Sequence, residues 1–304
     1  MPIPEVSKIW MNGKLVDWQD ATVHLLTHAL HYGSGVFEGI RAYDTAKGTH
    51  VFRLTDHMKR LERSAKIYMM DLPFSVEELV QATKDVIRTN ALESCYVRPI
   101  AYRGYGEMGL FPLHAPVDVA IAVWPWGTYL GDEGIKHGIR AKISSFRRFG
   151  PNSMPPAAKA TGQYINSSLA KVEAVKAGYE EAILLDDQGN ISEGSGENIF
   201  LVRDGAIATP PTFCDVLDGI TADTVFAICR DEGIPLDRKV LVRSDLYTAD
   251  EAFLTGTAAE IVPLREVDDR VIGTPGPVTR KIQDIFYGII KAENDRYADY
   301  LEWV

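Results

Sequence analysis

Cysteine is scarce in this sequence of 304 residues, and Cys95, Cys214 and Cys229 show neither CxxC nor metal-ligand spacing. An odd number of isolated cysteines argues against a disulfide scaffold and predicts reduced, buried thiols in a cytoplasmic protein. Long apolar runs are also missing, because the most apolar stretch, Val117–Trp124, is far too short to cross a bilayer. The N-terminus lacks the basic and apolar regions of a signal peptide.

The sequence also lacks an excess of positive charge. Its 42 acidic residues outnumber 32 lysines and arginines, which gives a formal net charge of −10. This charge repels phosphate backbones and anionic membranes, so neither nucleic acid nor a membrane is an expected partner. His24, His28 and His31 have helical spacing, but no acidic residue completes a ligand set, and we expect no metal site. A GxSxG motif is absent, which disfavours a Ser-His-Asp hydrolase.

What is present indicates two domains of mixed structure. The length exceeds the usual size of one domain, about 100–200 residues, and 46% hydrophobic residues suffice for ordinary globular cores. Strand and helix patterns intermix without a regular βαβ rhythm, which predicts an α+β fold. Proline and glycine near residues 125–131 predict a linker. We therefore expect a small α/β domain at residues 1–125, an interdomain loop at 126–134 and a large domain at 135–304.

Several local signals predict individual elements. Asn12-Gly13 between two short apolar runs is typical of a two-residue hairpin, because both residues tolerate positive φ. Ser75 and Glu78 form a capping box at the start of a helix. Further elements are expected as a hairpin around Lys47-Gly48, a hairpin at Asp204-Gly205, a helix from Tyr164 to Ala177, a helix capped by Thr221, and a last helix near Pro277.

Candidate chemistry begins at Lys159, which lies among small apolar residues. Such surroundings favour the neutral, nucleophilic amine that a Schiff base requires, although a lone lysine is more often a solvated surface group. Glu193 lies in a glycine-rich segment, where a carboxylate could keep a pyridine nitrogen protonated. The segment from Leu217 to Thr221 leads into a helix N-terminus and could form a phosphate cup. The glycine-rich segment at residues 33–39 lacks phosphate-loop spacing and predicts a tight turn, either beside a ligand or purely structural.

At these residues the sequence resembles the class IV fold of pyridoxal-phosphate-dependent enzymes, a two-domain fold similar to that of D-amino acid aminotransferase. Within this group it resembles the branched-chain amino-acid aminotransferases, from Ile9 to the start of the last helix at Gly276. The resemblance rests on HYGSGVFEGIRAY at residues 31–43, YVRP at 96–99, AAKA at 157–160, SEGSGEN at 192–198, LDGIT at 217–221 and GTAAEI at 256–261.

The resemblance implies pyridoxal 5′-phosphate as cofactor. Lys159 would hold it as a Schiff base and later move the substrate proton, Glu193 would pair with the pyridine nitrogen, and Tyr164 would donate to the phenolic oxygen. Arg60 would supply a permanently charged contact to the phosphate. The remaining cofactor positions implied by the resemblance are Leu217, Gly219, Ile220, Thr221, Gly256 and Thr257.

The resemblance also implies an aliphatic and aromatic substrate pocket with carboxylate-binding groups. The activity implied is reversible transfer of the amino group of L-leucine, L-isoleucine or L-valine to 2-oxoglutarate. Tyr32 and the segment from Met108 to Leu110 would come from a neighbouring subunit, which implies at least a homodimer and leaves a homohexamer open. Leu110 stands where valine is common, so the pocket is expected to be narrower. Thr161 stands where glycine is frequent, next to Lys159, and these two departures leave the preferred substrate side chain open. The implied substrate-binding positions are Tyr32, Phe37, Gly39, Arg41, Tyr96, Arg98, Met108, Leu110, Trp126, Tyr129, Thr257 and Ala258.

Two other kinds of function remain open from the sequence. The same scaffold could serve a D-amino acid aminotransferase, an aminotransferase for (R)-amines or an aminodeoxychorismate lyase. A non-enzymatic cofactor carrier is the second alternative, but the presence of both Lys159 and Glu193 disfavours it.

Overall fold

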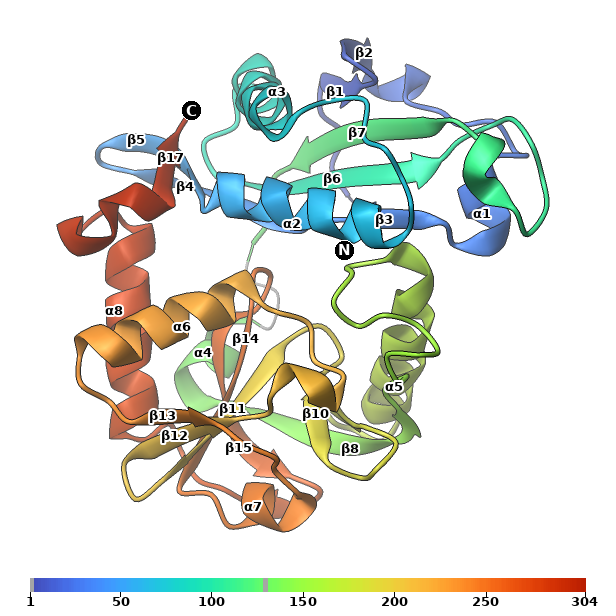
Figure 1. Cartoon of the computed structure of the whole chain (residues 1–304). Coiled ribbons are helices and arrows are strands. Elements are labelled where there is room, and N and C mark those ends of the chain that lie inside the picture. The colour runs from blue at the N-terminus through green and yellow to red at the C-terminus, as the bar shows by residue number, and fades with distance from the viewer. Residues whose placement is uncertain (1–2, 128–130) are drawn as a thin grey trace. The chain divides into compact units, whose positions relative to one another are not determined.

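The computed structural model describes residues 3–127 and 131–304, and its contacts divide them into two units (Figure 1). The first unit contains the described residues up to Gly127, together with Ala158–Gln163 and Ile289–Val304. The second unit contains the remaining described residues up to Ala157 and Tyr164–Gly288. Two short segments of the C-terminal half thus belong to the first unit. The domain bounds at 1–125 and 135–304 stay predictions. The interdomain loop at 126–134 stays a prediction.

An antiparallel sheet forms the centre of the first unit, in the order β17-β5-β4-β6-β7-β1-β2 with β3 paired to β6. The hairpin at Asn12-Gly13 is confirmed, since both residues have positive φ between β1 and β2. The hairpin at Lys47-Gly48 is confirmed as β4 and β5. The strands are β1 (Lys8–Met11), β2 (Lys14–Asp17), β3 (Gly35–Phe37), β4 (Ile40–Thr45), β5 (Gly48–Phe52), β6 (Cys95–Arg103), β7 (Val117–Trp124) and β17 (Leu301–Trp303).

Two long helices, α2 and α3, pack against each other and against this sheet (Figure 1). The capping box is confirmed, because Ser75 Oγ accepts from the N–H of Glu78 and the Glu78 carboxylate accepts from the N–H of Ser75. The apolar faces of both helices and of the sheet form one core. The helices of this unit are η1 (Trp18–Asp20), α1 (His28–Tyr32), α2 (Leu54–Ile67), α3 (Val76–Thr89), η2 (Pro112–His114), η3 (Thr161–Gln163) and η5 (Asp295–Tyr300).

The segment Ala158–Gln163 belongs to the first unit because its backbone pairs with β3 and the turn before it. The N–H of Gly162 donates to the carbonyl of Gly33 at 3.2 Å, and Val36 forms an isolated bridge with Ala160. Ala160 is part of the apolar core of this unit. Gly33 has φ +64, and a Cβ there would lie 2.8 Å from the Cα of Gly162, so this close approach requires glycine.

A mixed sheet forms the centre of the second unit, in the order β10-β9-β8-β15-β14-β11-β12-β13 with β16 paired to β15. β8 is parallel to both β9 and β15, whereas β11, β12 and β14 pair antiparallel. The hairpin at Asp204-Gly205 is confirmed as β11 and β12. The strands are β8 (Ile139–Arg147), β9 (Glu181–Leu185), β10 (Ile191–Gly194), β11 (Asn198–Arg203), β12 (Ala206–Thr209), β13 (Leu236–Arg238), β14 (Glu251–Gly256), β15 (Glu260–Val267) and β16 (Arg270–Val271).

Helices flank this sheet, with α5 against β8 and β9, and α6 against β13 and β14. The predicted helix from Thr221 is present, but the capping assignment is wrong, because the helix begins at Ile220 and Gly219 is the N-cap. The helices of this unit are α4 (Gly131–His137), α5 (Tyr164–Lys176), η4 (Thr212–Cys214), α6 (Ile220–Asp231), α7 (Arg243–Tyr247) and α8 (Pro277–Ile290). Among the described residues, no helix has the length and apolar character needed to cross a membrane.

Candidate functional site

Lys159 is anchored in the first unit by its backbone. Its N–H donates to Ser64 Oγ of α2 at 3.1 Å, and its carbonyl accepts from the N–H of Phe37 at 3.0 Å. The Nζ of Lys159 lies 5.2 Å from the centroid of the Phe37 ring. Ala158 and Ala160 on either side are buried, and Lys159 itself is half-buried. The amine therefore projects beside an aromatic ring from a backbone that is fixed on both sides.

A buried ion pair joins the end of β3 to α2. The two carboxylate oxygens of Glu38 accept from Nε and Nη2 of Arg60, each at 2.7 Å. Nδ1 of His57, one turn earlier on α2, donates to Glu38 at 2.7 Å. Glu38 is 0% exposed and Arg60 is 5% exposed. Sequence reasoning singled out Arg60 but missed Glu38, whose signal was an acidic residue at the end of an apolar strand.

The charges of this cluster follow from its contacts. Burial raises the pKa of Glu38, but Arg60 and His57 outweigh burial and hold that pKa well below its usual range. Burial lowers the pKa of His57 more than the neighbouring carboxylate raises it. The cluster therefore combines a carboxylate, a guanidinium and a neutral imidazole whose hydrogen is on Nδ1, since a carboxylate can only accept. Removing one partner of such a buried pair typically costs about 3–5 kcal/mol.

Aromatic rings and one arginine adjoin Gly39 in the same unit. The rings of Tyr96 and Trp126 lie 5.1 Å apart, and the Arg98 guanidinium lies 4.8 Å from the centroid of Phe37. Nη2 of Arg98 also donates to the Tyr96 hydroxyl at 3.3 Å. A Cβ on Gly39 would lie 2.1 Å from that hydroxyl, so the Tyr96 ring requires glycine at this position. The structure thus brings together five of the predicted substrate-binding residues.

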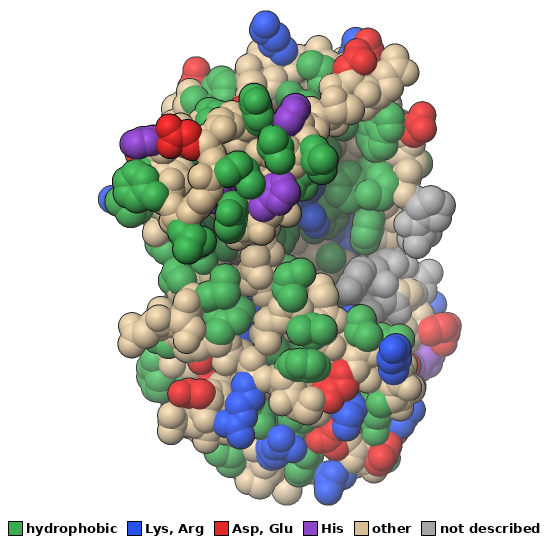
Figure 2. Space-filling view, turned by 90° about the vertical axis from the view of Figure 1, so that its right-hand side faces the viewer, with side chains coloured by type: hydrophobic (Ala, Val, Ile, Leu, Met, Phe, Trp, Pro, Cys, Tyr) green, Lys and Arg blue, Asp and Glu red, His purple; other side chains and the backbone are tan. Residues whose placement is uncertain are grey.

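The predicted residues Tyr32, Met108 and Leu110 lie on an exposed face of the first unit. Leu110 is 90% exposed, and Figure 2 shows hydrophobic and histidine side chains gathered on the face that carries α1. The buried His28 connects the two segments, because its Nε2 contacts the carbonyl of Gly109 at 2.8 Å and its ring stacks on Tyr32. His28 therefore links α1 to the loop around Gly109.

Three further predicted residues remain, and Arg41 is the cross-strand partner of Tyr96. Arg41 on β4 donates from Nη2 to the carbonyl of Gly127 at a long 3.5 Å. Tyr164 begins α5 of the second unit and is half-buried. Tyr129 lies outside the described residues.

Glu193 on β10 forms a second group of contacts, within the second unit. Its Oε1 pairs with Nη2 of Arg148 at 2.7 Å. Its Oε2 accepts from the N–H of Leu217 at 3.1 Å and from Nδ2 of Asn198 at 3.4 Å. Two predicted residues from separate motifs, Glu193 and Leu217, are thereby brought together. Sequence reasoning missed Arg148, which no motif marks, and Asn198, which ends the SEGSGEN motif.

The N-terminus of α6 follows directly from Leu217. Its N-cap, Gly219, has an extended backbone with φ −77° and ψ 134° and, as a glycine, offers no capping side chain. A Cβ on Gly219 would lie 1.9 Å from Oδ1 of Asn198, which explains why a glycine and not a capping side chain stands there. Ile220 and Thr221 are buried in the first turn. A helix N-terminus without a side-chain cap is a natural site for an anion.

The turn between β14 and β15 carries the last predicted residues, Gly256, Thr257 and Ala258. A Cβ on Gly256 would lie 3.2 Å from the carbonyl oxygen of Gly196 and 3.3 Å from Cγ of Glu197. The turn therefore packs closely on the SEGSGEN segment, and a side chain at Gly256 would force the two apart.

Glu197 of this segment and Glu181 of β9 are both buried carboxyl groups. Glu181 accepts from Nζ of Lys171 at 2.5 Å and from Oγ of Ser195 at 2.6 Å. Burial and the neighbouring Glu181 carboxylate together raise the pKa of Glu197 from 4.5 to about 8. Glu197 is therefore protonated near neutral pH, while Glu181 is paired with Lys171. Sequence reasoning singled out neither residue of this pair.

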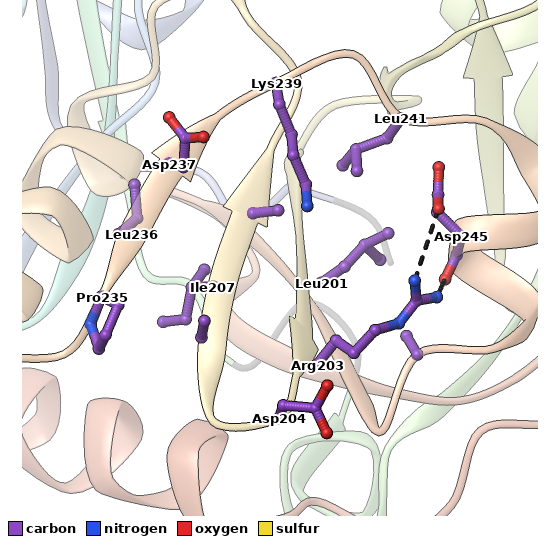
Figure 3. Close-up of a pocket in the computed structure, with 13 residues that line it drawn as sticks. Leu201, Arg203, Asp204, Ile207, Pro235, Leu236, Asp237, Lys239, Leu241 and Asp245 are labelled. Carbon is purple, nitrogen blue, oxygen red and sulfur yellow. Dashed lines mark hydrogen bonds and ion pairs between the residues drawn. The ribbon is translucent and has the colours of Figure 1, made fainter.

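A pocket of about 530 Å³ lies elsewhere in the second unit, between the β11–β12 hairpin, β13 and α7 (Figure 3). Its walls include Leu201, Ile207 and Leu241. The Arg203 guanidinium points toward Asp245 and pairs with that carboxylate at 3.7 Å. None of the predicted site residues lines this pocket, so it is separate from the groups described above.

Comparisons with known proteins agree over nearly the whole chain. A family profile described as "Amino-transferase class IV" matches residues 35–267. The chain is 48% identical over 295 residues to a "Branched-chain-amino-acid aminotransferase" of Pseudomonas aeruginosa. The match covers 96% of this chain and 95% of that protein.

Solved structures give the same result. A crystal structure of the Escherichia coli branched-chain amino acid aminotransferase has a TM-score of 0.96 and 48% identity, over 98% of this chain and 99% of that chain. A T.th. branched-chain amino acid aminotransferase with pyridoxamine 5′-phosphate has a TM-score of 0.95 and 46% identity, over 98% of this chain and 99% of that chain.

The raised pKa of Glu197 predicts a change in stability with pH. Between pH 4.5 and about 8 the unfolded chain releases this proton while the folded chain keeps it, so the free energy of unfolding falls as pH rises through this range. Glu197→Gln mimics the protonated carboxyl. We expect it to make the free energy of unfolding less dependent on pH. At pH 8 it should stabilise the protein by on the order of 4 kcal/mol, because the shift from 4.5 to about 8 corresponds to about 1.4 kcal/mol per pKa unit. Urea denaturation of the cofactor-free protein at a series of pH values measures this.

Glu133→Gln is the matched control, because that side chain is 86% exposed in the same unit. We expect its stability to follow the wild-type pH dependence. An unchanged slope in Glu197→Gln would contradict the assignment of the proton to Glu197.

Proposed function

Because this chain belongs to the class IV aminotransferase family, we propose that it is a branched-chain amino-acid aminotransferase that uses pyridoxal 5′-phosphate. Aminotransferases exchange amino acids and 2-oxo acids, and the proposed donors are L-leucine, L-isoleucine and L-valine, with 2-oxoglutarate as acceptor. The observation that carries the proposal is the likeness to proteins of that name over 96% of the chain. Three buried, unbridged cysteines support a cytoplasmic location.

The first unit offers donors that fit such a cofactor. The Lys159 amine beside the Phe37 ring is a nucleophile suited to the cofactor's aldehyde. Arg60, oriented by Glu38, would bind the phosphate. We propose that these two side chains act on the same cofactor molecule.

The second unit offers the complementary groups. The Glu193 carboxylate, held by Arg148 and the N–H of Leu217, would bind the protonated pyridine nitrogen. The first turn of α6 at Ile220 and Thr221 would bind the phosphate, because backbone N–H groups and the helix dipole at a helix N-terminus favour anions. Thr257 and Gly256 would contribute to the same phosphate contact, and Tyr164 would donate to the phenolic oxygen.

The bound cofactor would serve as an electron sink for the bonds of the substrate Cα. Lys159 Nζ would remove the proton from that carbon and return it, which is general acid–base catalysis by a positioned amine. Glu193 would keep the pyridine nitrogen protonated throughout. The acceptor half of the reaction would use the same residues in reverse order, so one site serves both substrates.

The aromatic group around Gly39 would bind the substrate. Phe37, Tyr96 and Trp126 present apolar surface, which suits a branched aliphatic side chain. Nε of Arg98 and Nε1 of Trp126 are buried and have no hydrogen-bond partner among the described residues. Such unpaired donors favour a ligand that carries an acceptor. We propose that Arg98 and Tyr96 bind carboxylate, together with the backbone of Thr257 and Ala258, and that Gly39, Arg41 and Tyr129 complete the pocket.

We also propose that the protein acts as a homodimer at least, in which Tyr32 and residues 108–110 reach the pocket of a neighbouring subunit. The exposed side chains of Leu30, Leu110 and Phe111 support this, because monomeric proteins rarely expose contiguous apolar patches. The contact of His28 with Gly109 links the two segments.

Lys159→Ala is expected to lower kcat by at least about a thousandfold, because it removes the acid–base amine, and to abolish the visible absorbance of lysine-bound cofactor. Glutamate formation and an absorbance spectrum measure the two effects. Lys66→Ala, on an exposed position of α2, is the control and should match the wild type. Normal turnover by Lys159→Ala would refute the assignment.

A panel of amino donors with 2-oxoglutarate tests the substrate class. We expect kcat/KM for L-leucine, L-isoleucine and L-valine to differ among themselves by no more than about 200-fold, since one methylene contributes only about 1–3 kcal/mol. The kcat/KM for each of these three donors should exceed that for D-alanine, (R)-phenylethylamine and aminodeoxychorismate. The readout is glutamate formation for the amines and product analysis for aminodeoxychorismate. A preference for any of the last three would overturn the proposed specificity.

Sedimentation velocity tests the oligomer and separates a dimer from a hexamer. Leu110→Asp should raise the dissociation constant of the dimer by about tenfold or more, because an unpaired charge would be buried in an apolar interface. Val271→Asp, at a residue 77% exposed in the second unit, is the matched control. A monomeric wild-type protein with full activity would contradict the proposal.

A further inference from the structure

We propose that Glu38 is a positioning residue. It fixes the orientation of the Arg60 guanidinium toward the cofactor phosphate and its position relative to the backbone of Lys159. The inference deepens the proposed function and rests on it, because it assumes that Arg60 binds phosphate. Glu38 itself touches neither cofactor nor substrate and acts only through the arginine.

The geometry of the pair leaves the guanidinium little freedom. Glu38 bonds Nε and Nη2 of Arg60 with separate oxygens, each at 2.7 Å. A two-point contact of this kind fixes the plane of the guanidinium as well as its position. Without it, a long arginine side chain would sample several rotamers. The orientation of Arg60 is therefore set before any ligand binds.

His57 fixes the carboxylate in turn. Its Nδ1 donates to Glu38 Oε2 at 2.7 Å, and its side chain is 1% exposed. Glu38 consequently receives two bonds from Arg60 and one from His57, all within the interior of the first unit. Both donors come from α2 at a spacing of three residues, so they lie on one face of the helix. The carboxylate is thus held between two points of one rigid element.

The same helix also fixes the lysine segment. Ser64 lies one turn after Arg60 on α2, and its Oγ accepts from the N–H of Lys159 at 3.1 Å. Phe37, the residue before Glu38, donates its N–H to the carbonyl of Lys159 at 3.0 Å. Glu38 therefore lies where the strand that holds the lysine backbone meets the helix that carries the arginine. Its carboxylate joins the two, and so sets the arginine relative to the amine.

Stabilisation of the fold alone does not account for a buried ion pair at this position. A buried ion pair adds little net stability compared with well-packed apolar side chains. The pair is instead suited to orientation, because it determines the direction in which a cation faces. Sub-ångström orientation matters for ligand contacts, where a displacement of about 1 Å can reduce function by on the order of a hundredfold.

The test compares two ligands that differ only in the phosphate, pyridoxal 5′-phosphate and pyridoxal. Apoenzyme of wild type and Glu38→Gln is titrated with each, and the dissociation constant is read from the absorbance of lysine-bound ligand. We expect Glu38→Gln to raise the dissociation constant of pyridoxal 5′-phosphate by about ten- to a hundredfold. The dissociation constant of pyridoxal should stay within about twofold of the wild-type value. A purely structural defect would weaken the binding of both ligands equally. Equal weakening, or no change in the binding of either ligand, would overturn the proposal.

Two further variants complete the test. Glu62→Gln makes the same substitution at an exposed position of α2 and should match wild type with both ligands. In an Arg60→Ala background, Glu38→Gln should cause no additional loss of affinity for pyridoxal 5′-phosphate, because the residue it orients is gone. An additional loss there would show that Glu38 acts by another route and would overturn the proposal.

The experiment also separates failure of this inference from failure of the proposed function. If wild-type protein binds neither ligand, or does not prefer the phosphorylated one, the proposed cofactor is wrong. If Glu38→Gln does not fold, Glu38→Asp keeps the charge but shortens the side chain, and the same selective loss is expected. Equal affinities of Glu38→Asp and wild type for both ligands would refute positioning by Glu38.

Discussion

The attachment of Lys159 to the first unit is the constraint on which the rest depends. Its carbonyl accepts from Phe37, its N–H donates to Ser64, and Gly162 nearby donates to Gly33. These bonds place a segment of the C-terminal half within the hydrogen-bonding pattern of an N-terminal sheet. Because the N–H and the carbonyl of Lys159 are both hydrogen-bonded, the backbone position from which its side chain extends is fixed.

Both units contain buried charged pairs. Glu38 pairs with Arg60, and Glu193 pairs with Arg148, while Glu181 pairs with the partly buried Lys171. Taking such groups out of water is costly unless the geometry is good and the remaining lone pairs are satisfied. In each pair, further donors from His57, Leu217 or Ser195 meet that condition. These pairs determine the directions in which the charged groups face.

Glycines decide how closely these groups approach. Gly39 leaves room for the Tyr96 hydroxyl, and Gly219 leaves room for the amide of Asn198, where a Cβ would lie 2.1 Å and 1.9 Å from the respective oxygens. At Gly219 the missing side chain also leaves the N-terminus of α6 without a cap. Absence of a Cβ thus permits close packing at both positions.

The sequence by itself determined what local chemistry controls: the hairpin at Asn12-Gly13, the capping box at Ser75, and the family motifs that mark Lys159 and Glu193. Those features depend on neighbouring residues, so they can be recognised along the chain. Only the tertiary structure decided that Ala158–Gln163 joins the first unit, that Gly219 replaces Thr221 as the N-cap, and that Glu38 and Arg148 hold the predicted residues. These depend on contacts between residues distant in sequence. Burial and packing choose the partners, so even a local signal such as the acidic Glu38 after an apolar strand does not identify them.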